Sequence, residues 1–249
     1  MPIDPADLNP TGRFSDRVED YVKYRPTYPR AAAECALDGA PPGTIVDVGA
    51  GTGIWTALLV GRGREVIALE PNAEMRAAAP QLPRVTWLDG TAEATGLPNE
   101  SAALVTVAQA FHWFRAEEAL REFARILVPG SHVALIWNRR SRWNLFTLGY
   151  REAILSVGAE TAAERMTFDP AVFHSSGVFE EPERFAFPHA QNLDREGLHG
   201  RARSASYVPK TGPRAEELGA RLDELFDNHA TDGRVQLVYE CEVWRAIRR

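Results

Sequence analysis

Three glycines at alternate positions, Gly49, Gly51 and Gly53, follow the short apolar run at positions 44–48. Glycine lets the backbone turn sharply and come close to a ligand. A helix that begins just after such a turn presents N–H groups that have no partner within the helix. The segment therefore predicts a buried strand, a tight turn and a helix, with a ligand site at the turn.

Short runs rich in β-branched residues alternate with helical stretches around this turn. We expect strands at 44–49, 65–70, 84–89, 102–108 and 132–138, and later at 183–190 and 234–244. We expect helices at 52–60, 72–79, 117–127, 193–206 and 214–229, with the sequence VPG at 128–130 as a turn into the fifth strand. Such alternation indicates βαβ units, so the predicted fold class is α/β with a mostly parallel sheet.

The pattern divides the chain into four parts. We expect an N-terminal helical cap (1–40, with helices at 14–24 and 31–37), a core (41–138), a helical lid insertion (139–182) and the C-terminal part of the core (183–249). The lid is suggested by Trp143, Phe146, Tyr150 and Ile154, which recur at helical spacing. The same stripe also fits ordinary core packing. The two interpretations are compatible, because a lid must bury one face.

Composition narrows the possible partners. The formal net charge is -6, and Lys and Arg are scattered, so the long-range field repels polyanions and nucleic acid is not expected. Cys35 and Cys241 are far apart and lack CxxC spacing, so no metal site or disulfide scaffold is expected. The sequence contains no signal-peptide pattern and no apolar run of about 18 residues. We therefore expect a cytoplasmic protein without a membrane partner.

Two carboxylates accompany the glycine turn. Asp47 lies inside the apolar strand and is expected to face the cleft or to hold N–H groups of the loop, since an unpartnered buried carboxylate is costly. A purely structural clamp remains the alternative for Asp47. Glu70 ends the next strand, about 20 residues further on, where a carboxylate can accept hydrogen bonds from both ribose hydroxyls of a nucleoside.

With these motifs the sequence resembles the class I S-adenosylmethionine-dependent methyltransferases. DVGAGTG resembles their first motif, the EP of ALEP their acidic second-strand end, and LVPGSHVALIW their segment after the fourth strand. FSDRVEDYVKYRPTYP, GTAEATGLP, AQAFHWF and VWRAIRR resemble a bacterial small-molecule branch similar to trans-aconitate methyltransferase-like proteins. A dinucleotide site would favour GxGxxG instead. The resemblance implies a Rossmann-like seven-stranded sheet with its last strand antiparallel.

The resemblance also implies S-adenosyl-L-methionine as the cofactor. Its expected contacts are Tyr21, Arg25, Asp47, Gly49, Ala50, Gly51, Gly53, Glu70, Pro71, Met75, Thr91, Ala92, Glu93 and Gln109. The family often has Asp where this chain has Thr91, and Asp89 or Glu93 could replace it at the adenine. Arg25 is expected to pair with the carboxylate of the donor.

Methyl transfer from a sulfonium is an in-line displacement, so alignment of the two reactants matters more than side-chain chemistry. A base is useful where the accepting atom carries a proton, and we expect His112, just after the fourth strand, to be that base. Packing or helix capping is the alternative role of His112. Acceptor contacts are expected from aromatic side chains at six positions: Tyr24, Trp55, Phe111, Trp113, Trp143 and Tyr207.

The predicted activity is methyl transfer to O, N or C of a small molecule, by a monomer or a homodimer. An alternative is a methyltransferase-fold protein that binds S-adenosylmethionine or S-adenosylhomocysteine but catalyses a non-methylating reaction such as cyclisation. A binding subunit without turnover is a third possibility. Arg201 and Arg203, in the region where acceptor specificity would be set, could bind an acidic acceptor or could be ordinary exposed helix charges.

Overall fold

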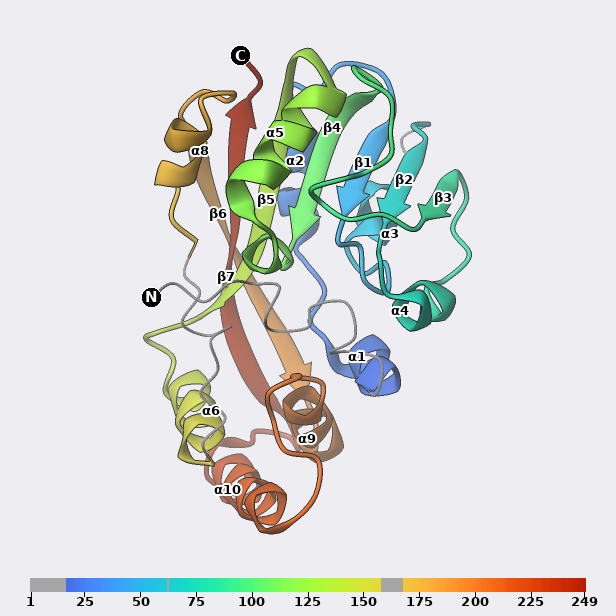
Figure 1. Cartoon of the computed structure of the whole chain (residues 1–249). Helices are drawn as coiled ribbons and strands as arrows, with labels where there is room; N and C mark the ends of the chain where they lie inside the picture. The colour runs from blue at the N-terminus through green and yellow to red at the C-terminus, as the bar shows by residue number, and fades with distance from the viewer. Residues whose placement is uncertain (1–16, 62, 158–167) are drawn as a thin grey trace.

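The computed structural model describes residues 17–61, 63–157 and 168–249, and it contains a seven-stranded sheet (Figure 1). The strand order is β3-β2-β1-β4-β5-β7-β6. The strands are β1 (Ile45–Val48), β2 (Val66–Leu69), β3 (Val85–Leu88), β4 (Ala102–Ala108), β5 (Leu127–Arg140), β6 (Glu183–Leu193) and β7 (Val235–Ile247). Strands β1 to β5 pair in parallel, whereas β7 runs antiparallel to both β5 and β6. The predicted Rossmann-like sheet with an antiparallel last strand is confirmed.

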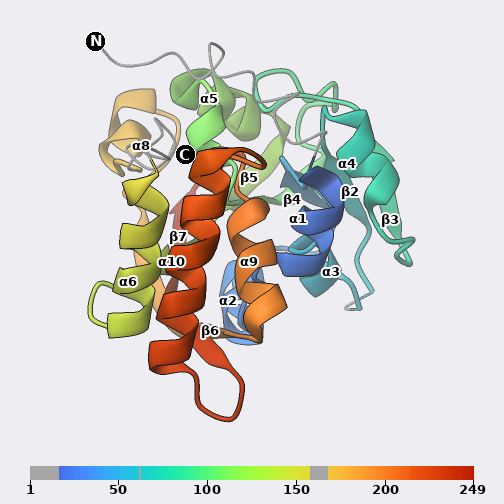
Figure 2. The ribbon, with the colours of Figure 1, turned by 90° about the horizontal axis from the view of Figure 1, so that it is seen from below.

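Helices cover both faces of the sheet and one end of it (Figure 2). They are α1 (Val18–Tyr24), α2 (Arg30–Leu37), α3 (Thr56–Leu59), α4 (Ala73–Ala78), the 3₁₀ turn η3 (Phe111–Trp113), α5 (Ala116–Ile126), α6 (Leu145–Ser156), α8 (Ala171–Ser176), α9 (Arg195–Arg203) and α10 (Pro213–His229). Helices α5 and α8 pack on one face of the sheet, and α2 and α3 pack on the other. Because both faces are covered, β4 is an almost unbroken buried apolar strand.

The helices α6, α9 and α10 form a separate apolar layer on the long ends of β6 and β7. Phe146 and Tyr150 of α6 pack there with Leu198 of α9, Leu222 of α10 and Tyr239 of β7. This three-helix layer hangs below the sheet in Figure 1. In the segment expected as an inserted lid, 139–182, α6 therefore shares its core with two helices from the C-terminal part of the chain, whereas α8 packs on the sheet beside α5.

Three local expectations differ from the structure. The helix expected at 52–60 is reduced to α3, since the chain turns through residues 49–55 first. The VPG segment lies inside β5 as a bulge, with Gly130 at φ +76°, and does not precede the strand. Trp143 is 91% exposed, because the Asn144 side chain caps α6 and the helical stripe begins only after it.

Parts of two predictions lie outside the described residues. These are positions 14–16 of the first expected helix, with the leader before them, and positions 158–167 of the expected lid. Within the described residues, no helix has both the length and the apolar character needed to cross a membrane.

Candidate cofactor-binding and active site

Two adjoining cavities lie at the carboxyl ends of β1, β2 and β4. The larger encloses about 1040 Å³ and the smaller about 500 Å³, each including its open mouth. Tyr21, Gly49, Ala108 and Gln109 line both of them, so the two form one continuous cleft. This is the edge of an open parallel sheet where ligands bind.

The glycine turn forms the floor where the two cavities meet. The φ values of Gly49, Gly51 and Gly53 are +69°, +58° and +82°. Residues other than glycine rarely adopt this backbone conformation. A Cβ atom on Gly49 would lie 2.6 Å from the Cβ of Ala110, which lies between β4 and η3. Glycine is therefore required at this position by both conformation and space.

Glu70 ties the end of β2 to the glycine turn. Its Oε2 accepts a hydrogen bond from the N–H of Gly51 at 2.8 Å, and its Oε1 accepts one from the N–H of Asn72 at 2.9 Å. Burial raises the pKa of this carboxyl, while the two backbone donors lower it. Glu70 also lines the larger cavity, and each oxygen keeps a lone pair that can accept a further hydrogen bond.

Asp47 lies in β1 beneath the smaller cavity and is 1% exposed. Its Oδ2 accepts a hydrogen bond from Thr56 Oγ1 at 2.6 Å, and its Oδ1 accepts one from Thr106 Oγ1 at 3.0 Å. Burial raises the pKa of Asp47 to about 7, although the two hydroxyl donors oppose the increase. Asp47 thus connects β1 to α3 and β4 and also borders the cleft.

The larger cavity collects most of the predicted cofactor contacts. The sequence-predicted residues that line it are Tyr21, Gly49, Gly51, Glu70, Pro71, Met75, Thr91, Ala92, Glu93, Gln109 and Trp113. Glu93 accepts a hydrogen bond from the N–H of Arg115 at 2.8 Å. The sequence did not single out six further lining residues: Asn72, Gly90, Ala108, Ala110, Phe114 and Arg115.

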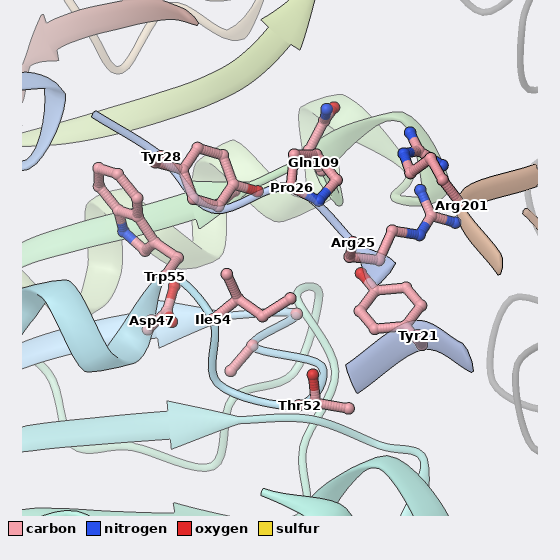
Figure 3. Close-up of a pocket in the computed structure, with 13 residues that line it drawn as sticks. Tyr21, Arg25, Pro26, Tyr28, Asp47, Thr52, Ile54, Trp55, Gln109 and Arg201 are labelled. Carbon is pink, nitrogen blue, oxygen red and sulfur yellow. The ribbon is translucent and has the colours of Figure 1, made fainter. Parts of the chain in front are cut away.

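The N-terminal segment lines one side of the smaller cavity (Figure 3). Tyr21, Arg25 and Tyr28 line it, together with Ala50 of the turn and Trp55 just after it. The Arg25 guanidinium lies 4.7 Å from the centroid of the Tyr21 ring. Burial lowers the pKa of Arg25, and the nearby charge of Arg201 lowers it further.

The aromatic segment after β4 points in several directions. Gln109 has φ +55°, an uncommon conformation for a residue other than glycine, and lies between the cavities. Phe111 packs in the core against Phe114 and Trp137 and lines neither cavity. His112 lines neither cavity and contacts the Trp113 ring at 4.8 Å. Burial, with the charges of Arg139 and Arg25, lowers the pKa of His112 to about 4.

Three other predicted acceptor contacts have distinct positions. The hydroxyl of Tyr24 donates to Glu196 of α9 at 2.6 Å and does not line the cleft. Tyr207 receives a hydrogen bond from Arg140 at 3.3 Å, next to the three-helix layer. Trp143 is exposed and lines neither cavity. Arg201, which the sequence left open as an exposed charge, is only 4% exposed and lines the smaller cavity.

Helix α1 is held over the cleft by a close contact with α9. A Cβ atom on Gly200 would lie 2.2 Å from the Tyr24 ring, so Gly200→Ala forces α1 away. Since α1 and its C-cap carry Tyr21 and Arg25, we expect this variant to bind S-adenosylhomocysteine at least about tenfold more weakly, as measured by calorimetry. Gly219→Ala in α10 is the control, because its Cβ would meet only His199, at 3.8 Å, and affinity should not change.

Comparisons with known proteins agree with this geometry. Residues 46–135 match the methyltransferase domain family. An uncharacterized methyltransferase-like protein of Schizosaccharomyces pombe is 32% identical over 85% of both chains. The chain belongs to the class I S-adenosylmethionine-dependent methyltransferases. An uncharacterized methyltransferase of Mycobacterium tuberculosis is 43% identical to this family member over 131 residues. The match covers 51% of this chain and 52% of that relative, so it spans about half the length of each.

Solved structures show the same fold. This family member superposes on a protein from Anaeromyxobacter dehalogenans that is described as a type II methyltransferase. The TM-score is 0.63 at 23% identity, and the superposition covers 90% of this chain and 97% of the other. Phosphoethanolamine N-methyltransferase 2 of Haemonchus contortus, solved with S-adenosylhomocysteine, gives a TM-score of 0.57 at 13% identity, covering 96% of this chain and 58% of the other. At these identities the likeness concerns the fold alone.

Proposed function

We propose that this protein binds S-adenosyl-L-methionine and transfers its methyl group to an oxygen, nitrogen or carbon atom of a small-molecule acceptor. The observation that carries the proposal is the position of Glu70, which lines the larger cavity while it holds the glycine turn. The narrower resemblance to trans-aconitate methyltransferase-like proteins stays a prediction.

The residues of the cleft fit the two ends of this donor. Glu70 has free lone pairs for ribose hydroxyls in the larger cavity, where Pro71, Met75 and Ala92 provide an apolar surface for adenine. Arg25 in the smaller cavity can pair with the carboxylate of the methionine part. When bound, the donor supplies an electrophilic methyl carbon on its sulfonium. The contribution of the chain is to align the acceptor and exclude water.

His112 is the proposed general base for acceptors that must lose a proton. With a pKa of about 4 its imidazole is neutral at pH 7, the form that accepts a proton, but it is a weaker base than an ordinary histidine. The base role therefore rests on its position just after β4, one residue before Trp113, which lines the larger cavity. We expect His112→Ala to keep its affinity for S-adenosylhomocysteine within about twofold and to slow methyl transfer at least about tenfold, measured as label incorporated per minute. Full activity of the variant would rule out the base role.

The proposed function has a direct test. Calorimetry with S-adenosylhomocysteine should give a dissociation constant in the micromolar range or tighter, and its absence would refute donor binding. The protein is then incubated with trideuteromethyl-labelled S-adenosylmethionine and a small-metabolite extract, and mass spectrometry should find one labelled product. If a metabolite is consumed without gaining label, the reaction is not a methyl transfer. Label found only in protein or nucleic acid would contradict a small acceptor.

A further inference from the structure

A buried arginine lines the smaller cavity of the cleft, whereas Glu70 lines the larger one. Arg201 of α9 is 4% exposed and lines the smaller cavity, next to Arg25 in Figure 3. Neither Arg25 nor Arg201 takes part in an ion pair with any of the described residues. Like charges lie close together here, since burial and the charge of Arg201 both lower the pKa of Arg25, and the charge of Arg140 acts in the same direction on Arg201. A buried charge without a counter-ion is costly, so this arrangement needs a partner.

Unused hydrogen-bonding atoms surround Arg201. The Nε atoms of Arg25 and Arg201 and the hydroxyls of Tyr150 and Tyr239 are buried and have no hydrogen-bond partner in the part of the chain that the structure describes. Tyr150 is fully buried and Tyr239 is 3% exposed, and both interact electrostatically with Arg201. Buried polar groups in native proteins are nearly always hydrogen-bonded. Arg25 and Arg201 each donate one hydrogen bond to Ser204, to its carbonyl and its hydroxyl respectively. Tyr150 and Tyr239 lie behind Arg201 without lining either cavity. The four donors left over on these residues therefore indicate an absent acceptor of hydrogen bonds beside Arg201.

Charge balance shows what kind of group fits there. S-adenosylmethionine carries a sulfonium and an ammonium but only one carboxylate, so its binding adds positive charge to the cleft. The acidic residues lining the cavities are Asp47, Glu70 and Glu93, and each already accepts hydrogen bonds from the protein. If Arg25 pairs with the carboxylate of the donor, Arg201 still lacks a counter-ion. The second substrate must then bring negative charge.

We propose that Arg201, with the hydroxyls of Tyr150 and Tyr239, binds an oxyanion of the methyl acceptor, either a carboxylate or a phosphate. This inference rests on the proposed function, because it assigns the acceptor to the donor-bound cleft. The three-helix layer acquires a role in this arrangement: α6 supplies Tyr150 and α9 supplies Arg201, so the layer that covers the ends of β6 and β7 also selects the acceptor.

The test measures the binding of small anions to protein saturated with S-adenosylhomocysteine. Succinate and inorganic phosphate are the two anionic probes, and succinamide is the neutral probe, all at the same ionic strength. We expect one of the anions, but not succinamide, to bind in calorimetry, and the better anion identifies the acceptor group. If neither anion binds more tightly than succinamide, the inference is wrong, whereas the proposed function fails only if S-adenosylhomocysteine itself does not bind.

Arg201→Gln should weaken the binding of the better anion at least about tenfold, the usual effect of losing a charged hydrogen-bond partner. Arg203→Gln is the matched control on the same helix. Its guanidinium is 43% exposed and lies 3.8 Å from Asp20, so anion binding should change less than about twofold. Equal losses in both variants would indicate a general charge effect and would overturn the assignment of Arg201.

Tyr150→Phe provides a second, structurally mild variant. It removes only a buried hydroxyl that has no partner, so the variant should be at least as stable as the parent protein without ligand. We nevertheless expect it to bind the better anion at least about threefold more weakly. Unchanged anion affinity in Tyr150→Phe would show that this hydroxyl does not take part, and a loss of stability would show that it already has another partner.

Discussion

Glu70→Ala will weaken the binding of S-adenosylhomocysteine by about 100-fold or more, measured by calorimetry at neutral pH. The substitution removes the carboxylate that is proposed to accept the ribose hydroxyls, and hydrogen bonds to a charged group contribute about 1.5–3 kcal/mol each. It also removes the acceptor of the Gly51 and Asn72 N–H groups, so the glycine turn loses its support. Both losses act in the same direction.

Two further variants separate these contributions. Glu65→Ala lies just before the same strand at its opposite end, where the carboxylate is 60% exposed and pairs with Arg84, so donor affinity should stay within about twofold. Glu70→Gln keeps one oxygen acceptor, and we expect an intermediate affinity. If Glu70→Ala binds S-adenosylhomocysteine as tightly as the parent protein while it melts normally, the ribose assignment is wrong.

The sheet was predictable because its strands carry their own signal. Helices cover both faces of the sheet at β4, so the sequence of this strand is a nearly continuous run of apolar residues. Its predicted bounds, 102–108, agree with the structure. Helices α9 and α10 begin as expected near Asp194 and Pro213, residues that favour helix N-termini. The bulge in β5 was less visible, since a sequence such as VPG indicates a turn without showing that strand pairing resumes on both sides.

The positions of Glu70 and the glycine turn follow from topology, because parallel strands bring their carboxyl ends to one edge. The directions of the side chains in η3 do not follow from the sheet topology. Phe111, His112 and Trp113 are consecutive, and a 3₁₀ turn sends each in a different direction, so their roles depend on packing against β5 and residues beyond it.

The burial of Arg201 could not be derived from local pattern. It depends on a contact between residues far apart in the sequence, Gly200 of α9 and Tyr24 of α1, which brings α9 against the cleft. A weak signal was present, because glycine inside a helix often marks a close approach of another segment. The exposed position of Trp143 also had a signal, in the Asn144 cap that begins α6 after it.

Asp47→Asn will remove a large pH dependence of stability. The pKa of Asp47 is raised from 3.8 to about 7 in the folded protein, so between these values the folded state holds a proton that the unfolded state has lost. Stability must therefore fall as the pH rises through this interval. Between pH 5 and pH 8 this carboxyl should cost about 3 kcal/mol of unfolding free energy.

Urea unfolding of both proteins at pH 5, 6, 7 and 8 measures this effect. The difference in unfolding free energy between Asp47→Asn and the parent should increase with pH up to about pH 7 and then level off. His112 has a lowered pKa and acts in the opposite direction between pH 4 and 6.5, but it is present in both proteins and cancels in the difference. Asp38→Asn, at a carboxyl that is 80% exposed, should show a nearly constant difference.

The same carboxyl links donor binding to pH. Asp47 lines the smaller cavity, where the methionine part of the donor is proposed to lie against Arg25. The ammonium of that methionine part is a nearby cation, and a nearby cation favours the ionised carboxylate. Binding of S-adenosylhomocysteine at pH 6 should then release up to one proton, seen by calorimetry in buffers of different ionisation enthalpy. Affinity should rise by up to about tenfold from pH 6 to pH 8. Asp47→Asn should show neither effect, and an identical pH profile in the variant would separate Asp47 from the donor and leave it as a clamp between β1, α3 and β4.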